Sequence, residues 1–177
     1  MKEKEANEFK NRAIEMIKET SIKINNNEIE KCELADFGLD NFQNEGAQIF
    51  TFVNTNRIGV KVIVLLPNQT LPEHLHPPIG NDPGKEEILR VIKEPLRVYI
   101  PGDNTLSKGF IPDKKEEEYT VLNENILNEG EQIILEPGTK HWFQAGENGS
   151  VFFSFSTTVR DGKDIFTDKE VDRGVND

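Results

Sequence analysis

The chain of 177 residues contains three histidines, and all of them lie in two short motifs. His74 and His76 stand in PEHLHPP, residues 72–78, and His141 stands in PGTKHW, residues 137–142. Side chains alternate along an extended strand, so a spacing of two places both imidazoles of the first motif on one face. The Pro-Gly turn of the second motif delivers the third imidazole to the start of another strand. Because neutral imidazoles bind divalent transition metals, we predict a metal centre with these three histidines as ligands.

A carboxylate follows the histidine pair after a loop rich in proline and glycine. The segment GKEEILR, residues 84–90, begins the next β-rich run, so its carboxylates can return beside the histidines in a hairpin. Glu87 or Glu86 can supply an oxygen ligand, and strand alternation turns Glu87 toward the metal and Glu86 away from it. The same alternation places Lys85 on the face of Glu87. We therefore predict Glu87 as the fourth ligand and Lys85 as a cation beside the metal, with a solvated loop lysine as the alternative.

Each motif taken alone has an ordinary structural explanation. A His-x-His pair on a strand is more often hydrogen-bonded or exposed than metal-bound, and a Glu-Glu pair is usually surface charge. The combination carries the prediction, because every histidine falls in a suitable β context with a carboxylate on the next run. Three imidazoles and one carboxylate suit a divalent transition metal and leave positions open for a substrate. Alternation turns Glu73 away from this face, which makes it a poor candidate for a catalytic base.

Short strands are the elements that must position these residues. Seven β-rich runs are separated by clusters of Gly, Pro and Asn, without a helical pattern between them, which favours an antiparallel sandwich or barrel. One amphipathic helix precedes them over residues 3–19. Phe143 is expected to face the cavity and Trp142 the other side of its strand, while Phe152, Phe153 and Phe155 are expected in the core. The predicted strands span residues 48–53, 59–66, 87–93, 96–100, 132–135, 141–145 and 151–157.

The composition limits the partners and the location of the protein. Its 21 Lys and Arg against 32 Asp and Glu give a net charge of −11, which argues against binding a phosphate backbone. No apolar stretch approaches the roughly 18 residues of a membrane-spanning helix, and the charged start does not resemble an export signal. Cys32 is the single cysteine, which fits a reducing compartment. We expect a cytoplasmic, single-domain protein that binds neither nucleic acid nor a membrane.

The motifs also carry a resemblance. His-x-His, a downstream Glu and a final His after a Pro/Gly turn are similar to the two motifs of the cupin superfamily, although ten residues separate His76 from Glu87 where fewer are usual. That longer spacing and the surrounding residues resemble the D-lyxose ketol-isomerase family. The matching segments are ADFGL at 35–39, FVNTNR at 52–57, PEHLHPP at 72–78, GKEE at 84–87, GTKHWFQAGE at 138–147 and DIFTD at 164–168. They cover nearly the whole chain after the first helix.

The resemblance implies a fold, a reaction and an assembly. The fold is a mainly all-β cupin-type barrel or jelly roll, and we assign residues 1–28 to an N-terminal helical extension and residues 29–177 to the barrel with its C-terminal tail. The reaction is aldose-ketose isomerisation of a free sugar, chiefly D-lyxose to D-xylulose, with Mn²⁺ the usual metal and a homodimer the usual assembly. Such a reaction moves a proton between C2 and C1 through an enediol, and Lys85 is the catalytic candidate that stabilises or protonates the enediolate oxygen.

Two other classes of function stay open at this point. Three histidines and one glutamate can also hold Fe(II) in a cupin dioxygenase, and a cupin can bind sugars without catalysis. Phosphorylated sugars are less expected, because no Arg/Lys cluster or Gly-rich anion cradle adjoins the motifs. The DIFTD segment has no chemistry of its own that we can derive, and it could close over the barrel mouth or pack on a partner subunit.

Overall fold

The computed structural model describes residues 3–174 as one long helix, one short helix and eleven strands. The helices are α1 (Glu3–Lys18) and α2 (Asn26–Glu30), and a 3-10 turn, η1, spans Asp161–Lys163. The strands are β1 (Glu33–Ala35), β2 (Ala47–Asn54), β3 (Ile58–Leu65), β4 (Thr70–Leu75), β5 (Glu87–Lys93), β6 (Leu96–Ile100), β7 (Asn123–Leu127), β8 (Gln132–Leu135), β9 (His141–Ala145), β10 (Ser150–Thr157) and β11 (Ile165–Phe166).

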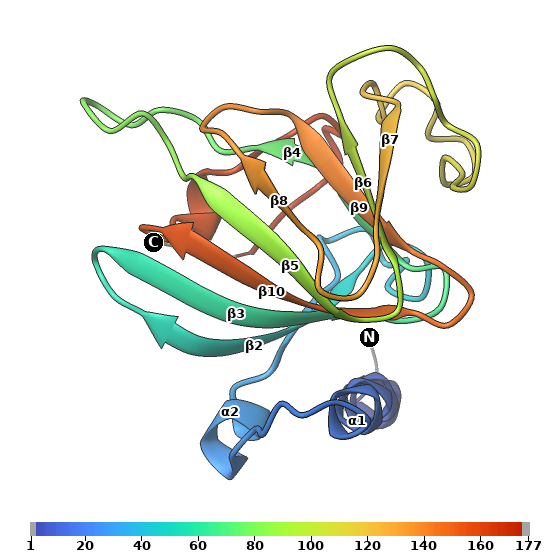
Figure 1. Ribbon diagram of the computed structural model, residues 1–177, viewed down its shortest axis with the longest axis vertical. Coiled ribbons are helices and arrows are strands. Elements are labelled where there is room, and N and C mark those ends of the chain that lie inside the picture. The colour runs from blue at the N-terminus through green and yellow to red at the C-terminus, as the bar shows by residue number, and fades with distance from the viewer. Residues whose placement is uncertain (1–2, 175–177) are drawn as a thin grey trace.

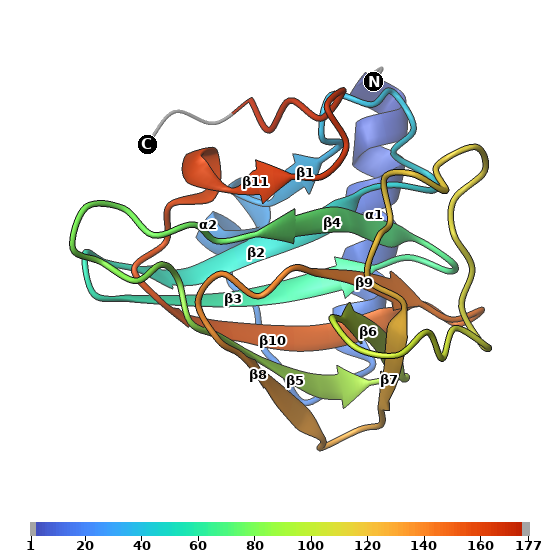
Figure 2. The ribbon, with the colours of Figure 1, turned by 90° about the horizontal axis from the view of Figure 1, so that it is seen from above.

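The strands form two sheets that face each other across a common core (Figures 1 and 2). One sheet has the order β1-β2-β3-β10-β5-β8 and the other has the order β11-β4-β9-β6-β7. The pairings between these strands are antiparallel. The two histidine-bearing strands, β4 and β9, are neighbours in the second sheet, whereas β5 lies in the first. The predicted mainly β, cupin-type fold with an N-terminal helix is confirmed.

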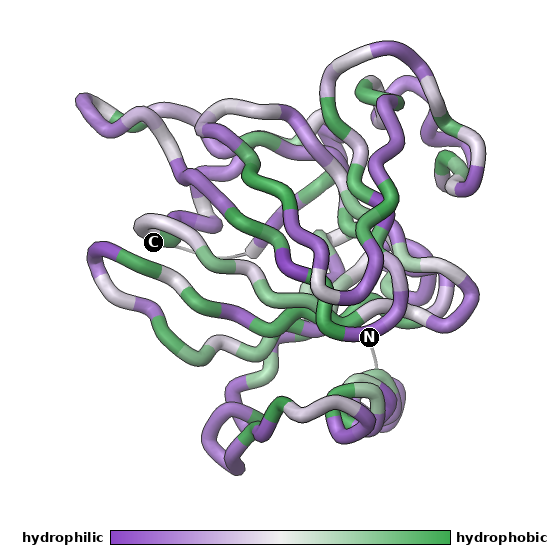
Figure 3. Tube along the Cα trace, viewed as in Figure 1, coloured by the Kyte–Doolittle hydropathy of each residue, from purple (hydrophilic) through white to green (hydrophobic). Residues whose placement is uncertain are grey.

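Alternate residues of the strands point between the sheets and form the main core. Ile63, Leu89 and Phe152 belong to this cluster, and hydrophobic colour recurs along β3 and β10 in Figure 3. The prediction of a core position for Phe152 is therefore confirmed. Phe153 and Phe155 are half-buried and stack on each other at a centroid distance of 5.1 Å. Alternation turns both rings to the outer face of this sheet, away from the main core. Phe153 packs there against a second core cluster, which contains Val62 and Val64, whereas the expected core position of Phe155 was wrong.

Helix α1 covers part of that outer face. Phe9, Ala13 and Ile17 recur at helical spacing and pack with Val62 and Val64 of β3 in a second apolar cluster. The helix therefore adheres to the barrel through its apolar stripe. Helix α2 crosses residue 28, where the sequence analysis divides the helical extension from the barrel, and that division stays a prediction. Within residues 3–174, no helix is long and apolar enough to cross a membrane.

The chain returns to the barrel mouth after β10. Residues 160–174, which we call the C-terminal strap, include η1 and β11, and β11 pairs with β4 through Ile165–Leu75 and Phe166–His74. The approach to the strap passes close to Gly59, where a Cβ atom would lie 2.3 Å from Cγ2 of Val159. A glycine is therefore needed on β3 at this crossing. The strap includes the DIFTD segment, and it closes over the mouth rather than extending away from the barrel.

The strand predictions succeeded where burial and β-rich composition coincide. The bounds predicted for β5, β6, β8 and β9 are those observed, and those of β2, β3 and β10 differ by one residue at one or both ends. The sequence analysis also placed the His-x-His motif on an extended strand, which is β4. It missed α2, β1 and β11, and it gave no bounds for β7, of which it expected only a short strand after the charged residues 114–118. These elements are short or polar, so their local patterns do not distinguish them from loops.

Candidate metal centre and active-site cavity

Three buried imidazoles meet between the sheets. His74 and His76 come from β4 and the residue that follows it, and His141 begins the neighbouring strand β9. Each histidine offers one ring nitrogen to a set in which all three atoms lie within 4.8 Å of one another. The centroids of the His74 and His141 rings are 4.3 Å apart. The structure thus brings the three predicted histidines together, in a geometry that could hold one metal ion.

The other ring nitrogens are held by fixed acceptors. Nδ1 of His74 lies 2.9 Å from the carbonyl oxygen of Pro72, and Nδ1 of His141 lies 2.7 Å from that of Thr139. Because a carbonyl oxygen can only accept, Nδ1 carries the proton in both rings and Nε2 keeps a free lone pair. Among residues 3–174, Nε2 of His141 is buried without a hydrogen-bond partner. A buried lone pair held in this way fits a metal ligand.

The third imidazole uses a carboxylate in place of a carbonyl. Nδ1 of His76 lies 2.6 Å from Oδ1 of Asp164, which belongs to the C-terminal strap. Metal-binding histidines commonly donate their second ring N–H to such a group, which orients the ring and increases its basicity. Asp164 was not singled out by the sequence analysis, apart from its place in DIFTD. The strap thereby contributes directly to the geometry of the histidine cluster.

Burial favours neutral rings at two members of the cluster. Burial, reinforced by the neighbouring imidazoles, lowers the pKa of His74 well below its usual value. Burial and His76 lower the pKa of His141 to about 3. His76 differs, because its contacts with Asp164 and Glu87 outweigh burial and the charge of Lys85 and raise its pKa. Neutral rings at His74 and His141 have the protonation state that metal binding requires.

Glu87 lies beside the imidazoles at the start of β5. Its side chain is buried, with Oε2 3.2 Å from Nε2 of His76 and 3.9 Å from Nε2 of His141. Oε1 accepts a hydrogen bond from the hydroxyl of Ser154 on β10. Burial would raise the pKa of Glu87, but Lys85 and His76 outweigh it and hold the pKa well below its ordinary value. The carboxylate therefore faces the histidines in its ionised form.

The neighbours of Glu87 follow the predicted alternation. Glu86 is exposed, whereas the side chain of Lys85 is 10% exposed and lines the same cavity as Glu87. Nζ of Lys85 lies 3.7 Å from Oε2 of Glu87 and 3.9 Å from Oδ1 of Asp161. Burial would lower the pKa of Lys85, but the carboxylates of Glu87, Asp164 and Asp161 outweigh it and raise the pKa. The roles of Glu87 as a ligand and of Lys85 in catalysis stay predictions.

The cavity beside the cluster has one apolar and one charged wall. Phe143 stacks on His141 at a centroid distance of 5.1 Å, and Phe166 of the strap stacks on His74 at 5.2 Å. Phe143 thus lies on the cavity side, as expected, while Trp142 packs with Tyr99 and Tyr119 on the opposite side of β9. Except for Lys85, the residues of the charged wall were missed by the sequence analysis. It comprises Lys61, Asp161, Asp164 and Arg173 together with Lys85.

Glu73 faces away from the cluster, as alternation requires. Its buried carboxylate accepts hydrogen bonds from the backbone N–H groups of Thr120 and Val121, at 2.6 and 2.9 Å, and from the hydroxyl of Thr167 at 2.5 Å. It therefore ties the long connection between β6 and β7 and the strap to β4. The prediction that Glu73 does not point toward the ligand face is confirmed.

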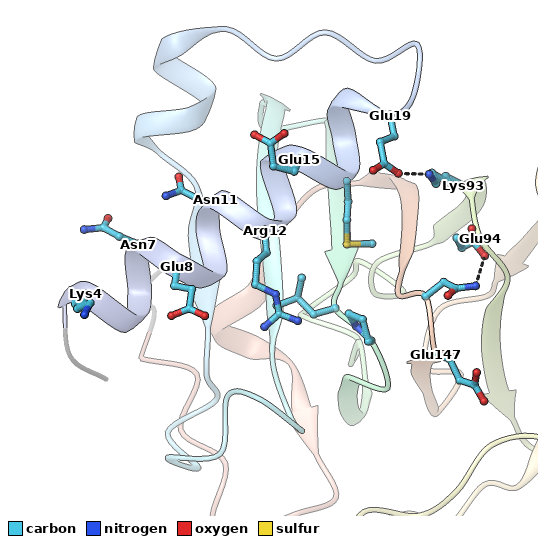
Figure 4. A pocket seen from close by; sticks show the side chains of 14 residues that line it. Lys4, Asn7, Glu8, Asn11, Arg12, Glu15, Glu19, Lys93, Glu94 and Glu147 are labelled. Atoms are coloured by element: carbon cyan, nitrogen blue, oxygen red, sulfur yellow. Dashed lines mark hydrogen bonds and ion pairs between the residues drawn. The ribbon is translucent and has the colours of Figure 1, made fainter.

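A larger groove lies elsewhere, along α1 (Figure 4). It has a volume of about 860 Å³ and is lined by α1, the turn after β3 and the ends of the β5–β6 and β9–β10 connections. Its polar contacts are surface pairs, such as Lys93 with Glu19 and Asn148 with Glu94. None of the three histidines lines it. Its size alone would make this groove the candidate active site. We assign the active site to the smaller cavity between the sheets, because the three histidines converge there.

Comparison with known protein families identifies relatives over nearly the whole chain. A sequence profile described as D-lyxose isomerase matches residues 5–175. A D-lyxose ketol-isomerase of Cohnella laeviribosi is 44% identical over 98% of this chain and 96% of its own length. A D-lyxose/D-mannose isomerase of Thermosediminibacter oceani is 42% identical over the same shares of both chains.

Comparison with solved structures identifies the same architecture at lower sequence identity. An L-ribose isomerase of Cellulomonas parahominis superimposes with a TM-score of 0.80 at 14% identity, over 98% of this chain and 96% of that chain. An L-ribose isomerase mutant of Acinetobacter sp. DL28 gives a TM-score of 0.81 at 14% identity, over 98% and 95%. At this identity the likeness establishes a shared fold.

Proposed function

The chain belongs to the D-lyxose isomerase family and is a sugar isomerase, and from this premise we propose that it interconverts free aldoses and ketoses with the help of a divalent metal ion. The preferred pair in this proposal is D-lyxose and D-xylulose, with D-mannose and D-fructose as a secondary pair. The observation that carries the metal dependence is the cluster of three buried imidazoles, two of which have Nδ1 bonded to a carbonyl and Nε2 turned inward.

Four side chains would hold the ion. We assign His74, His76, His141 and Glu87, because the carboxylate of Glu87 lies beside two of the three Nε2 atoms. Neutral imidazoles with one carboxylate leave a divalent ion with a net positive charge, and four protein ligands leave open positions at an ion that prefers six. Manganese is the metal that we expect. When bound, the ion supplies a Lewis acid that polarises the sugar carbonyl and stabilises negative charge on its oxygen.

The side chains around the ligands prepare the site for proton transfer. Ser154 and Asp164 orient Glu87 and His76 by hydrogen bonds, which fixes the geometry before the sugar arrives. Lys85 is the catalytic cation in this proposal: its ammonium lies in the cavity beside Glu87, where it stabilises or protonates the oxygen that becomes negative in the enediolate. Phe166 and the rest of β11 cover the cluster and exclude water from it.

The charged wall favours a free sugar over a sugar phosphate. Among the described residues, each cation of the cavity faces a carboxylate: Lys61 faces Asp161, Lys85 faces Glu87, and Arg173 pairs with Glu33. A phosphate would have to compete with these partners for its cations. The polar groups instead offer alternating donors and acceptors, which suit hydroxyl groups.

The proposed reaction is tested with metal-depleted protein. Manganese should restore turnover of D-lyxose, a chelator should abolish it, and D-xylose should be a poor substrate because its configuration at C2 is inverted. In heavy water, transfer through an enediol should place deuterium on C1 of the ketose. If the metal-loaded protein isomerises no free pentose or hexose, the proposal is wrong, and oxygen consumption with an organic substrate would then favour a dioxygenase.

A matched pair of variants tests the assignment of Glu87 as the fourth metal ligand. Glu87→Gln should reduce manganese affinity and turnover at least about 10-fold, because it removes the one anionic ligand. Glu86→Gln should be close to neutral, because Glu86 is exposed. The measurement is manganese titration followed by initial rates with D-lyxose. A larger loss in Glu86→Gln would refute the assignment of Glu87.

Three further expectations concern the protein in the cell. We propose a homodimer in the cytoplasm, without a nucleic-acid partner, as the resemblance, Cys32 and the net charge of −11 suggest. Light scattering of the purified protein tests the dimer. A monomer at micromolar concentration would contradict it.

A further inference from the structure

Helix α1 covers only one end of the outer face of the first sheet. Val62 and Phe153 point outward and pack in the apolar cluster beneath this helix, which crosses the sheet near the ends of β3 and β5 (Figure 2). The strands continue past the helix toward the barrel mouth. The next outward residues there are Val60 and Phe155, and within residues 3–174 they belong to none of the apolar clusters. This end of the face is therefore apolar, and neither described helix packs on it.

Four apolar side chains form a row across this uncovered end. Phe155 of β10 lies opposite Val60 of β3 on one side and Ile88 of β5 on the other, and Ile88 lies opposite Ile134 of β8. Residues paired in this way share one face of a sheet, and it is the outer face, because Leu89, next to Ile88, belongs to the main core. Ile134 is 53% exposed, and the other three side chains are half-buried. We call these four residues the apolar row. A contiguous apolar surface of this kind is typical of a protein contact.

Charged residues flank the apolar row with opposite signs on its two sides. The outward positions of β5 are Glu86, Ile88 and Arg90, with Glu86 toward the mouth and Arg90 toward α1, and both charged residues are exposed. On the neighbouring strand, exposed Glu136 continues the acidic side, while Gln132 lies opposite Arg90 and accepts a hydrogen bond from it at 3.0 Å. Along the strand direction, the surface is therefore acidic, then apolar, then basic.

This order of charges is complementary to itself under one particular rotation. About a two-fold axis that runs along the apolar row, each residue of the row meets its own counterpart, and the strand direction is reversed. Glu86 then faces the partner's Arg90, in two equivalent contacts. A two-fold axis along the strands would instead set carboxylates against carboxylates. Because each copy carries a net charge of −11, only the first arrangement combines apolar burial with attraction between the copies.

We propose that the apolar row, with Glu86 and Arg90 on its two sides, binds a second copy of this chain, sheet on sheet, about a two-fold axis along the row. Reversed strands remain aligned, which is the common geometry of stacked sheets. The proposal rests on the homodimer proposed above and gives it a defined interface. This interface lies directly behind the active site, because Glu87, next to Ile88, points to the opposite face of β5 toward the histidines. The partner thus supports the strand that presents the proposed fourth ligand.

Two exposed isoleucines offer a matched test of the apolar row. Ile134 and Ile126 are 53% and 41% exposed and lie on the edge strands β8 and β7, but β7 belongs to the other sheet. In the proposed dimer, Ile134→Asp sets two carboxylates against each other inside an apolar contact. Its dissociation constant, measured by analytical ultracentrifugation of manganese-loaded protein, should therefore rise at least about 100-fold. Ile126→Asp should leave the dissociation constant unchanged.

Exchange of the two charges tests the direction of the axis. Arg90→Glu should raise the dissociation constant about 10-fold or more, because a carboxylate then faces the partner's Glu86 twice. Glu86→Arg should do the same with two facing cations. The double variant restores both attractions and should return to within about threefold of the wild type. The hydrogen bond from Arg90 to Gln132 is lost in the single and the double variant alike, so it cannot explain such a rescue.

The neutral variant Glu86→Gln separates lost attraction from repulsion. It removes an exposed charge without placing like charges together, so its dissociation constant should change by less than about fivefold. Circular dichroism should show the wild-type spectrum for every variant, since the substituted residues are exposed. If Ile134→Asp does not fold, the charge exchange decides between the outcomes, because it leaves the apolar row intact.

The outcomes distinguish the interface from the proposals on which it builds. A wild-type protein that is monomeric at micromolar concentration would refute the homodimer together with its interface. A dimer that folded Ile134→Asp leaves intact would refute the interface alone, and a double variant that stays as weak as Arg90→Glu would refute the axis along the row. None of these measurements needs a substrate. A wild-type dimer that isomerises no free sugar would therefore refute the proposed reaction and leave the interface standing.

Discussion

The side chains that fill the barrel differ between its two ends, although at both ends alternate residues of each strand point inward. At one level of β10, Phe152 lies opposite Val91 of β5 and Ile63 of β3, and the contacts are apolar. Two residues further along, Ser154 faces the same interior opposite Lys61, and its hydroxyl binds Glu87. The backbone is the same at both levels, and the side chains alone change. The apolar level supplies stability, and the polar level at the mouth supplies chemistry.

The two levels also differ in their sensitivity to substitution. Apolar contacts are lost with every atom that is removed, because the surrounding core relaxes incompletely. Polar contacts at the mouth contribute less net free energy to folding. Burying a charge or an imidazole costs its hydration energy, and this cost offsets most of the gain from the new contacts. We therefore expect substitutions at the mouth to act on metal binding and turnover, and substitutions in the apolar level to act on stability.

The largest effect is expected for His141→Ala at the mouth. This change removes the imidazole whose Nε2 is buried and, within residues 3–174, accepts or donates no hydrogen bond, and with it one of four proposed ligands. Manganese content and kcat/KM should each fall more than about 100-fold, since loss of supporting residues around metal ligands already costs about 10–100-fold. Elemental analysis and initial rates with D-lyxose measure the two losses. Full metal occupancy in this variant would contradict the metal site.

The next largest effect is expected for Phe152→Ala at the apolar level. Phe152 is fully buried among the core residues of both sheets. Truncation should lower the free energy of unfolding by about 3–5 kcal/mol through lost burial and a residual cavity. Urea unfolding at constant manganese concentration measures this loss. The folded fraction should still bind manganese with near wild-type affinity, and a large loss of affinity would show that the two levels are not separable.

A smaller effect is expected for Asp164→Asn, which tests how the strap supports the mouth. The amide keeps the shape of the side chain but weakens the acceptor for Nδ1 of His76. Manganese affinity should fall about 10–100-fold, while the melting temperature of the metal-free protein changes little. Asp82→Asn is the control, because Asp82 forms a surface pair with Arg160 and should leave manganese affinity unchanged. Equal losses in both variants would show that the substitution disturbs the strap as a whole.

The sequence was sufficient to predict much of the fold and the end of the cavity at which the histidines lie. Period-two alternation at His74 and His76, and again from Lys85 to Glu87, correctly predicted which side chains share a face, because alternation is a local property of a strand. The bounds of β5 and β9 followed from β-rich composition between turn residues. The sequence of β7, NENIL, lacks this β-rich composition. The strand lies at the edge of its sheet and stays partly exposed, so it does not need apolar side chains throughout.

The charged wall could not be predicted in the same way. Lys61 stands among valines and isoleucines, which marks it as unusual, but nothing local indicates that its partner is Asp161. That contact depends on the path of the strap across the mouth and on Gly59, which lets Val159 pass close to β3. Residues a hundred positions apart meet only through the topology of the sheets. The family motif DIFTD identified the segment without revealing what Asp164 contacts.

The smallest effect on turnover is expected for Cys32, which lies on the outer side of the first sheet. Neither level of the barrel interior is involved there. Cys32 is half-buried against the apolar cluster beneath α1. Burial raises its pKa from 9.0 to about 11, so the neutral thiol persists to high pH. At pH 8 the thiolate should therefore be about 100-fold scarcer than for an ordinary thiol, since each pKa unit is a factor of ten.

Alkylation by iodoacetamide should accordingly be about 100-fold slower in the native protein at pH 8 than in the urea-unfolded chain, and should accelerate about tenfold per pH unit up to its pKa. Cys32→Ser should keep wild-type turnover of D-lyxose, because the thiol lies outside the cavity. Mass spectrometry of timed samples measures the rate. Rapid alkylation at pH 7 with loss of activity would mean that this face opens to solvent together with the mouth, and the separation between the outer face and the chemical interior would fail.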